Sequence, residues 1–116
     1  MNKGVYLPRN IPITETKVLW GKGGNRCAVC RTGLTMQSNG FSEYPLGEAA
    51  HIEGYSVGSA RYNSNMKDKE RNSYANLVLL CPTCHSIIDK IPSSYTTSDI
   101  KKIKDEHEKW VERVIK

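Results

Sequence analysis

The chain of 116 residues is poor in the residues that build a large apolar core. It contains one Phe and two Trp, 38% of its residues are hydrophobic, and its longest aliphatic run covers only residues 77–80. A run of that length cannot cross a bilayer, which takes about 20 residues. Residues 1–10 also lack the apolar stretch of about 7–15 residues that secretion requires. We therefore expect a cytoplasmic protein that does not enter a membrane.

A small core needs another source of stability, and four cysteines offer one. They form two C-x-x-C pairs, Cys27 with Cys30 and Cys81 with Cys84. Two disulfides are disfavoured in a reducing compartment, and a redox pair usually occurs once, beside a strand–helix unit. Four thiolates are the ligand set of a closed tetrahedral zinc site. We predict a structural zinc ion, with a long insert between the two pairs.

Basic residues outnumber acidic ones by 17 to 12, which gives a formal net charge of +5. This balance favours an anionic partner, nucleic acid or an acidic membrane surface, although a merely soluble basic protein has it too. Candidate phosphate contacts lie in the polar stretch of residues 56–74, and no pattern singles one of them out. They are Arg61, Lys67, Lys69 and Arg71.

Two short strands and a short helix are expected around the second cysteine pair. Residues 49–52 and 76–80 are apolar and brief, as strands of a small domain are. Residues 83–90 have the pattern of one or two helical turns, with Ile87 and Ile88 turned inward. The order strand, strand, helix follows.

Two further helices are expected at the flanks. Residues 14–20 are predicted to form a short helix, capped by Thr14 and broken by the glycines that follow. Residues 98–116 show apolar residues at helical spacing and are predicted to form the longest helix, capped by Ser98 or Thr97.

Polar composition with Gly, Ser and Asn predicts loops over residues 31–47 and 56–74, the second with one helical turn near residues 68–71. In the last helix, His107 falls on the apolar stripe and is expected to be a packed structural residue. The lysines beside that stripe, Lys104 among them, are expected to be solvated.

Cys84 and His85 are adjacent residues of metal-ligand type, and adjacent side chains on a helix diverge by about 100°. If Cys84 joins the zinc, His85 turns away and shares a face with Asp89, four residues on. An imidazole and a carboxylate make an open site that suits Mg²⁺, Mn²⁺ or Ni²⁺ and leaves room for a phosphate. His51 is the candidate general base, because a histidine of ordinary pKa, about 6.5, accepts a proton at neutral pH.

His51 in EAAHI, Asn76 in NLVLLC and His85 in CPTCHSIID follow the order of a His–Asn–His signature. In this the chain resembles the HNH endonucleases, a branch of the ββα-metal nucleases, and the cysteine pairs resemble those of the zinc-stapled members. The resemblance covers roughly residues 26–109. GEAAHIEGYSVGSARYN and IKDEHEKWV are also similar to HNH modules of bacterial anti-phage defence and restriction proteins.

The resemblance implies an α+β fold with a small ββα-metal (His-Me finger) core, a four-cysteine structural zinc site and flanking helices. It implies a single HNH nuclease domain over residues 1–116, either a whole protein or one module of a longer chain that has a sensing domain or a partner protein. The implied substrate is DNA. Because one site cuts one strand, a clean double-strand break would need two copies.

The resemblance also assigns roles to single residues. His51 would activate the attacking water as general base. His85 and Asp89 would bind the catalytic metal. Asn76 would brace the long loop through hydrogen bonds and hold His51 in place.

Two positions depart from the commoner pattern of these nucleases. Ala50 stands where many have an Asp or His ligand directly before the base, and Asp89 stands where many have a second His. The first departure leaves the metal one ligand short. Glu48 lies on the same strand face as Ala50 and could reach the ion; we favour its pairing with a base such as Arg26, which would orient the site.

Two other classes of protein explain part of the pattern. A non-catalytic zinc module that binds nucleic acid or protein would account for the cysteines and the charge, but not for His51, Asn76 and His85 together. A thiol redox protein would account only for the cysteines. The sequence does not distinguish double-stranded DNA, single-stranded DNA and RNA as substrates.

Overall fold

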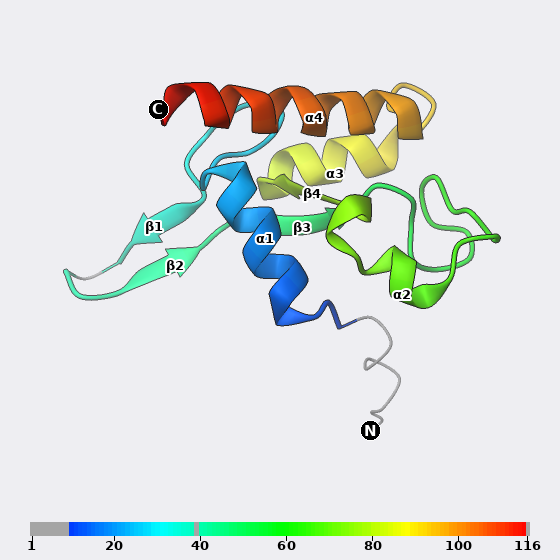
Figure 1. Cartoon of the computed structure of the whole chain (residues 1–116), viewed down its shortest axis with the longest axis horizontal. Helices are drawn as coiled ribbons and strands as arrows, with labels where there is room; N and C mark the ends of the chain where they lie inside the picture. Colours follow the sequence, from blue (N-terminus) through cyan, green and yellow to red (C-terminus); the bar gives the residue numbers. More distant parts are fainter. Residues whose placement is uncertain (1–9, 39, 116) are drawn as a thin grey trace.

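The computed structural model describes residues 10–38 and 40–115, so the irregular segment expected before residue 10 and the predicted helix end at Lys116 lie outside it. Figure 1 shows how the elements are arranged. In chain order they are α1 (Ile13–Gly23), β1 (Thr35–Gln37), β2 (Glu43–Pro45), β3 (Glu48–His51), α2 (Asp68–Arg71), a 3₁₀ turn (Tyr74–Asn76), β4 (Leu77–Leu80), α3 (Pro82–Lys90) and α4 (Thr97–Val114).

β3 and β4 form an antiparallel pair in which Glu48 faces Leu80 and His51 faces Leu77. All four residues of β4 are buried, which explains why this strand is a continuous aliphatic run rather than an alternating one. Cys81 alone separates β4 from α3, and α3 packs against both strands. The two strands and the helix form a ββα unit, and the predicted α+β fold is confirmed.

α1 and α4 contact each other and β4 (Figure 1). Two glycines at the end of α1 allow this close packing. A Cβ on Gly23 would lie 2.6 Å from Cδ2 of Leu79, so only glycine allows α1 to approach β4 this closely. Gly24 has a φ of 62° and ends α1 in the left-handed conformation. His107 of α4 is 2% exposed, and its Nε2 donates to the carbonyl of Gly23 (2.9 Å), which confirms its packed position.

The predicted caps of both flanking helices were wrong. α1 begins one residue before Thr14, and its N-cap makes no side-chain hydrogen bond. The helix continues past Gly21 to Gly23, the glycine that packs against Leu79. α4 is capped by Thr96, whose hydroxyl accepts from the N–H of Asp99 (3.2 Å). Within the ranges that the structure describes, no helix has the length and apolar character needed to cross a bilayer.

Residues 31–47 are not wholly a loop as predicted, because they contain the antiparallel hairpin of β1 and β2. Met36 faces Tyr44 across this pair. Both strands have three residues, all exposed, so they lack the apolar alternation that marks a strand in sequence. The hairpin extends away from the helices in Figure 1.

Two expectations about side-chain direction also failed. Ile88 is buried, at 2% exposed, but Ile87 is 43% exposed and does not point inward. Lys104 is not solvated: its ammonium donates to the carbonyls of Tyr74 (3.0 Å) and Leu77 (2.7 Å), and burial lowers its pKa. Lys104 therefore fastens α4 to the start of β4.

Candidate active site and zinc site

The four cysteine side chains converge into one cluster at the start of α3. Their sulfur atoms all lie within 4.8 Å of one another, and Sγ of Cys30 lies 3.9 Å from Sγ of Cys81. Two sulfurs on a tetrahedral zinc ion, each bonded at about 2.3 Å, lie about 3.8 Å apart. Spacing and donor chemistry therefore fit the predicted structural zinc site.

The second cysteine pair is positioned by the way α3 begins. Cys81 is the N-cap, and its Sγ accepts from the N–H of Cys84 (3.4 Å). Pro82 occupies the first helical turn, where an N–H has no partner within the helix. The helix start thus turns both sulfurs toward the same point.

The first pair lies in a tight loop that is fastened to β4. The N–H of Cys27 donates to the carbonyl of Thr32 (3.0 Å), and the N–H of Arg31 donates to the carbonyl of Cys27 (2.9 Å). Ala28 donates its N–H to the carbonyl of Leu79 (2.9 Å), two residues before the second pair begins. This bond brings the two pairs together across the long insert.

The thiol pKa values show why the cluster suits a cation. Burial raises the pKa of Cys84 well above its ordinary value, with hydrogen bonding to Cys81 and the charge of Cys27 adding to the effect. Burial also acts to raise the pKa of Cys27, but backbone N–H groups outweigh it and lower that pKa to about 7. Crowded thiolates repel one another, so a bound dication favours the fully deprotonated cluster.

His85 follows Cys84 directly, yet its side chain contacts a different set of groups. Its Nε2 lies 3.1 Å from Oδ2 of Asp89, one helical turn on, and its Nδ1 lies 2.8 Å from Oε1 of Glu48. Each ring nitrogen thus faces a carboxylate oxygen. The side chains of the two neighbours therefore point to different groups, Cys84 to the other cysteines and His85 to two carboxylates.

His51, His85 and Asp89 line one cleft of about 180 Å³. His51 is the last residue of β3. His85 and Asp89 lie on α3, which follows β4 after Cys81. The remaining walls come from the segment after β3, namely Gly54, Tyr55, Ser59 and Ala60. Three predicted site residues therefore share one cleft.

The donor set of His85 and Asp89 fits an open site for a divalent ion. Their facing atoms are 3.1 Å apart, and two neighbouring ligands of an octahedral ion, bonded at about 2.0–2.1 Å, lie about 3 Å apart. Across residues 10–38 and 40–115, only the four cysteines form a group of three or more potential ligands close enough to hold an ion. An ion at His85 would have two protein ligands and open positions for water and substrate.

Glu48 does not pair with Arg26 as predicted. Its carboxylate contacts Nδ1 of His85, and the carboxylate of Asp89 contacts Nε2 of the same ring. Arg26 belongs to the zinc loop and donates to the carbonyl of Arg31 (3.4 Å). Glu48 is therefore placed to orient His85, as outer carboxylates orient metal-bound histidines.

Arg61 was predicted to contact phosphate, but its side chain is 4% exposed. The guanidinium donates to the carbonyls of Ile52 (2.6 Å), Ile88 (2.9 Å) and Tyr95 (3.2 Å) and pairs with Asp89. The φ of Arg61 is 57°, a left-handed conformation that few residues with a Cβ adopt. Arg61 thus joins the loop to α3 and holds Asp89, and it is not available to DNA.

Arg71 was also predicted to contact phosphate and is likewise buried. Its guanidinium donates to the carbonyls of Met66 (2.6 Å) and Gly54 (3.3 Å) inside the long loop. Lys67 and Lys69 are exposed. Of the four candidates, these two lysines alone have side chains that nucleic acid can reach.

Asn76 is buried, and its amide joins the two ends of the long loop. Nδ2 donates to the carbonyls of Glu53 and Arg71 (3.0 Å each), and Oδ1 accepts from the N–H of Glu53 (2.9 Å). Asn72, and not Asn76, contacts the imidazole of His51: its Oδ1 lies 2.8 Å from Nε2 of that ring. Nothing in the sequence marks Asn72, which lies in the polar stretch beside charged residues.

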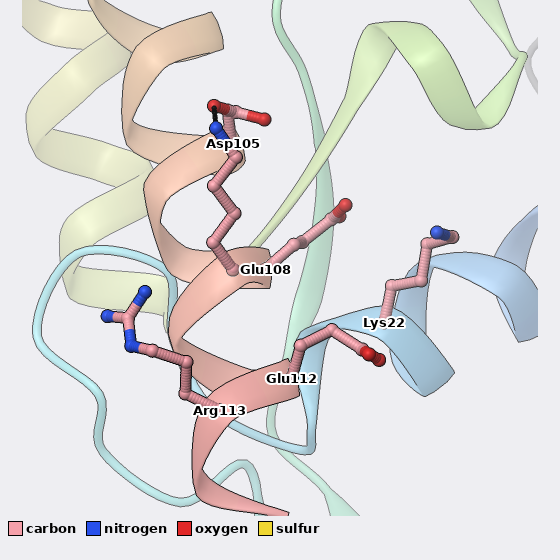
Figure 2. A pocket seen from close by; sticks show the side chains of 6 residues that line it. Lys22, Asp105, Glu108, Glu112 and Arg113 are labelled. Atoms are coloured by element: carbon pink, nitrogen blue, oxygen red, sulfur yellow. Dashed lines mark ion pairs between the residues drawn. The ribbon is translucent and has the colours of Figure 1, made fainter.

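A larger hollow, of about 400 Å³, lies between α1 and α4 (Figure 2). It is lined by Lys22, Asp105, Glu108, Lys109, Glu112 and Arg113. Asp105 forms an ion pair with Lys109 (3.0 Å), so two of the charged groups that line the hollow already neutralise each other. This hollow contains none of the predicted site residues, and we locate the active site by chemistry rather than by volume.

The ββα unit, the cysteine cluster beside it and the cleft with two histidines together define a ββα-metal nuclease architecture. A family model described as HNH endonuclease matches residues 27–91, more than half of the chain. The chain therefore belongs to the HNH endonuclease family, whose members are nucleases that use divalent metals. A search of curated proteins finds no match.

Proposed function

We propose that this protein is a metal-dependent endonuclease that hydrolyses phosphodiester bonds in DNA. Family membership supplies the reaction class. The observation that carries the proposal is the cleft in which His51 meets His85 and Asp89. A non-catalytic zinc module gives no reason for this grouping.

In the reaction that we propose, His51 accepts a proton from a water molecule, and the water oxygen bonds to phosphorus. The bond to the 3′-oxygen breaks, the departing oxygen takes a proton from solvent water, and the products carry a 5′-phosphate and a 3′-hydroxyl. A divalent ion held by His85 and Asp89, Mg²⁺, Mn²⁺ or Ni²⁺, would polarise the phosphate and stabilise charge on the leaving oxygen. Glu48, whose carboxylate lies 2.8 Å from Nδ1 of His85, would hold the proton on that nitrogen and leave the lone pair of Nε2 for the ion.

We extend the proposal to a defence or restriction role in the cytoplasm. The likeness of residues 47–63 and 103–111 to defence-associated HNH modules supports this role. One cleft cuts one strand, so a double-strand break would require two copies or a partner that positions a second cut.

The test is the nicking of supercoiled plasmid by the purified protein with Mg²⁺ or Mn²⁺, with and without chelator. We expect nicking that the chelator abolishes and that His51→Ala reduces by about 10²–10⁴-fold, the range of a general base. A wild-type protein that binds DNA without cutting it under either metal would favour the zinc-module alternative.

A further inference from the structure

Asn72 follows α2 directly, and its side chain reaches the histidine at the end of β3. Its Oδ1 lies 2.8 Å from Nε2 of His51, and the residue is 7% exposed. The contact lies on the loop side of the imidazole and involves no residue of the HNH signature other than His51. It therefore bears on which ring nitrogen does the chemistry.

The amide of Asn72 is oriented by its second contact. Its Nδ2 donates to the carbonyl oxygen of Asn10 (3.4 Å). If the amide were rotated by 180°, Oδ1 of Asn72 would face the carbonyl oxygen of Asn10, and two acceptors would repel each other. The amide nitrogen therefore faces Asn10, and the amide oxygen faces His51. An amide oxygen only accepts hydrogen bonds, so Nε2 of His51 carries the proton, and in the neutral ring the lone pair is on Nδ1.

We infer that Asn72 is a positioning residue that holds His51 as the Nε2–H tautomer and directs Nδ1 to take the proton from water. This inference rests on the proposed function, because it assumes that His51 is the base. It adds a residue to the reaction and assigns the atom that accepts the proton.

The side-chain amide of Asn76 fixes the backbone on either side of the contact between Asn72 and His51. It binds Glu53, two residues after His51, and the carbonyl of Arg71, one residue before Asn72. The carbonyl of Asn76 also accepts from the N–H of Ile52 (2.8 Å). The segments that carry the two side chains are thus joined on either side of their contact.

The test compares Asn72→Leu, which has similar size and no acceptor, with Asn72→Asp, which keeps the acceptor. Both variants lose the bond to Asn10, and only Asn72→Asp keeps an oxygen that can accept from Nε2 of His51. The first measurement is the ¹⁵N–¹H signal of His51 Nε2 at about pH 8.5, well above the ordinary histidine pKa of about 6.5. His51→Ala assigns the signal, and plasmid nicking, zinc content and Tm are measured in parallel.

We expect the wild type to show a hydrogen-bonded Nε2–H signal, Asn72→Leu to lose it, and Asn72→Asp to regain it. Asn72→Leu should nick about 10–100-fold more slowly, the loss typical of removing an outer hydrogen bond to a functional histidine, with zinc retained. Asn72→Asp should stay within a few-fold of wild type. If Asn72→Leu does not fold, Asn72→Ala takes its place.

A wild-type signal and rate in Asn72→Leu, or an Asn72→Asp no better than Asn72→Leu, would overturn the inference. Failure of the proposed function gives a different result: the wild type would not nick DNA, or His51→Ala would nick at the wild-type rate. The Nε2–H signal would then still decide whether Asn72 sets the tautomer.

Discussion

Nη2 of Arg61 lies 2.6 Å from Oδ1 of Asp89, and the arginine side chain of this ion pair is buried. The other carboxylate oxygen, Oδ2, faces His85. Arg61 therefore leaves Oδ2, the oxygen nearest His85, to bind the divalent cation that we propose. It also binds carbonyls of the loop and of α3, so it couples the wall of the cleft to the helix that carries the ligands.

Replacing Arg61 by Met should lower the free energy of unfolding by about 2–4 kcal/mol, because buried carbonyl groups lose their donor. Asp89 is 40% exposed, so the lost ion pair contributes less than the carbonyls do. Half-maximal nicking should also require roughly tenfold more Mn²⁺, since Asp89 is no longer held. Urea unfolding and a Mn²⁺ titration of nicking measure the two effects.

The matched control is Lys69→Met, which removes an exposed cation from α2. Its stability should stay within about 0.5 kcal/mol of wild type. Wild-type stability in Arg61→Met together with weaker DNA binding would show that Arg61 contacts phosphate after all.

His85→Ala should separate the two metal sites. Because His85 contacts Glu48 and Asp89 rather than the cysteines, the variant should stay folded with zinc bound. Residual nicking should need more divalent metal, and Mn²⁺ binding measured by calorimetry should weaken. His51→Ala is the control, since it should keep both zinc and Mn²⁺ affinity. Zinc loss in His85→Ala would place His85 in the zinc site instead.

Cys81→Ser should unfold or aggregate the domain rather than merely slow it. Cys81 supplies one of four sulfurs and also caps α3, so its loss removes a zinc ligand and the start of the helix. Zinc content and Tm are the measurements. A folded Cys81→Ser protein with the wild-type Tm would contradict a stabilising role for the cluster.

DNA binding by the inactive His51→Ala variant should be electrostatic and nearly independent of sequence. Lys67 and Lys69 are exposed, whereas Arg61 and Arg71 are buried, so replacing both lysines should reduce the salt slope of binding by about 1–2. Fluorescence anisotropy over a range of salt concentrations measures the slope. One preferred duplex that stays bound at high salt would point to base readout instead.

Local sequence patterns were enough to predict the centre of the molecule. The C-x-x-C spacing gave the cysteine cluster, and the i, i+4 spacing of His85 and Asp89 gave their pairing, because both depend on short-range geometry. The aliphatic run before Cys81 predicted a short strand, and all four residues of that strand are buried.

The burial of the two arginines could not be predicted, because it depends on carbonyl groups that only the folded loop presents. Arg61 and Arg71 lie among polar residues, a context that normally indicates an exposed loop. The contact of Asn72 with His51 is a tertiary contact of the same kind. The end of α1 was also missed. Glycines normally indicate the end of a helix, but α1 extends to Gly23, where only glycine fits against Leu79.

The two cysteine pairs lie on either side of the catalytic strands in the chain: Cys27 and Cys30 precede β3, and Cys81 and Cys84 follow β4. During synthesis the first pair leaves the ribosome well before the second, and neither pair alone makes a closed site. Because metal capture and folding are coupled in small zinc domains, we expect a nascent chain to be inert until Cys84 has emerged. The supply of zinc to new chains would then set how much of the protein matures.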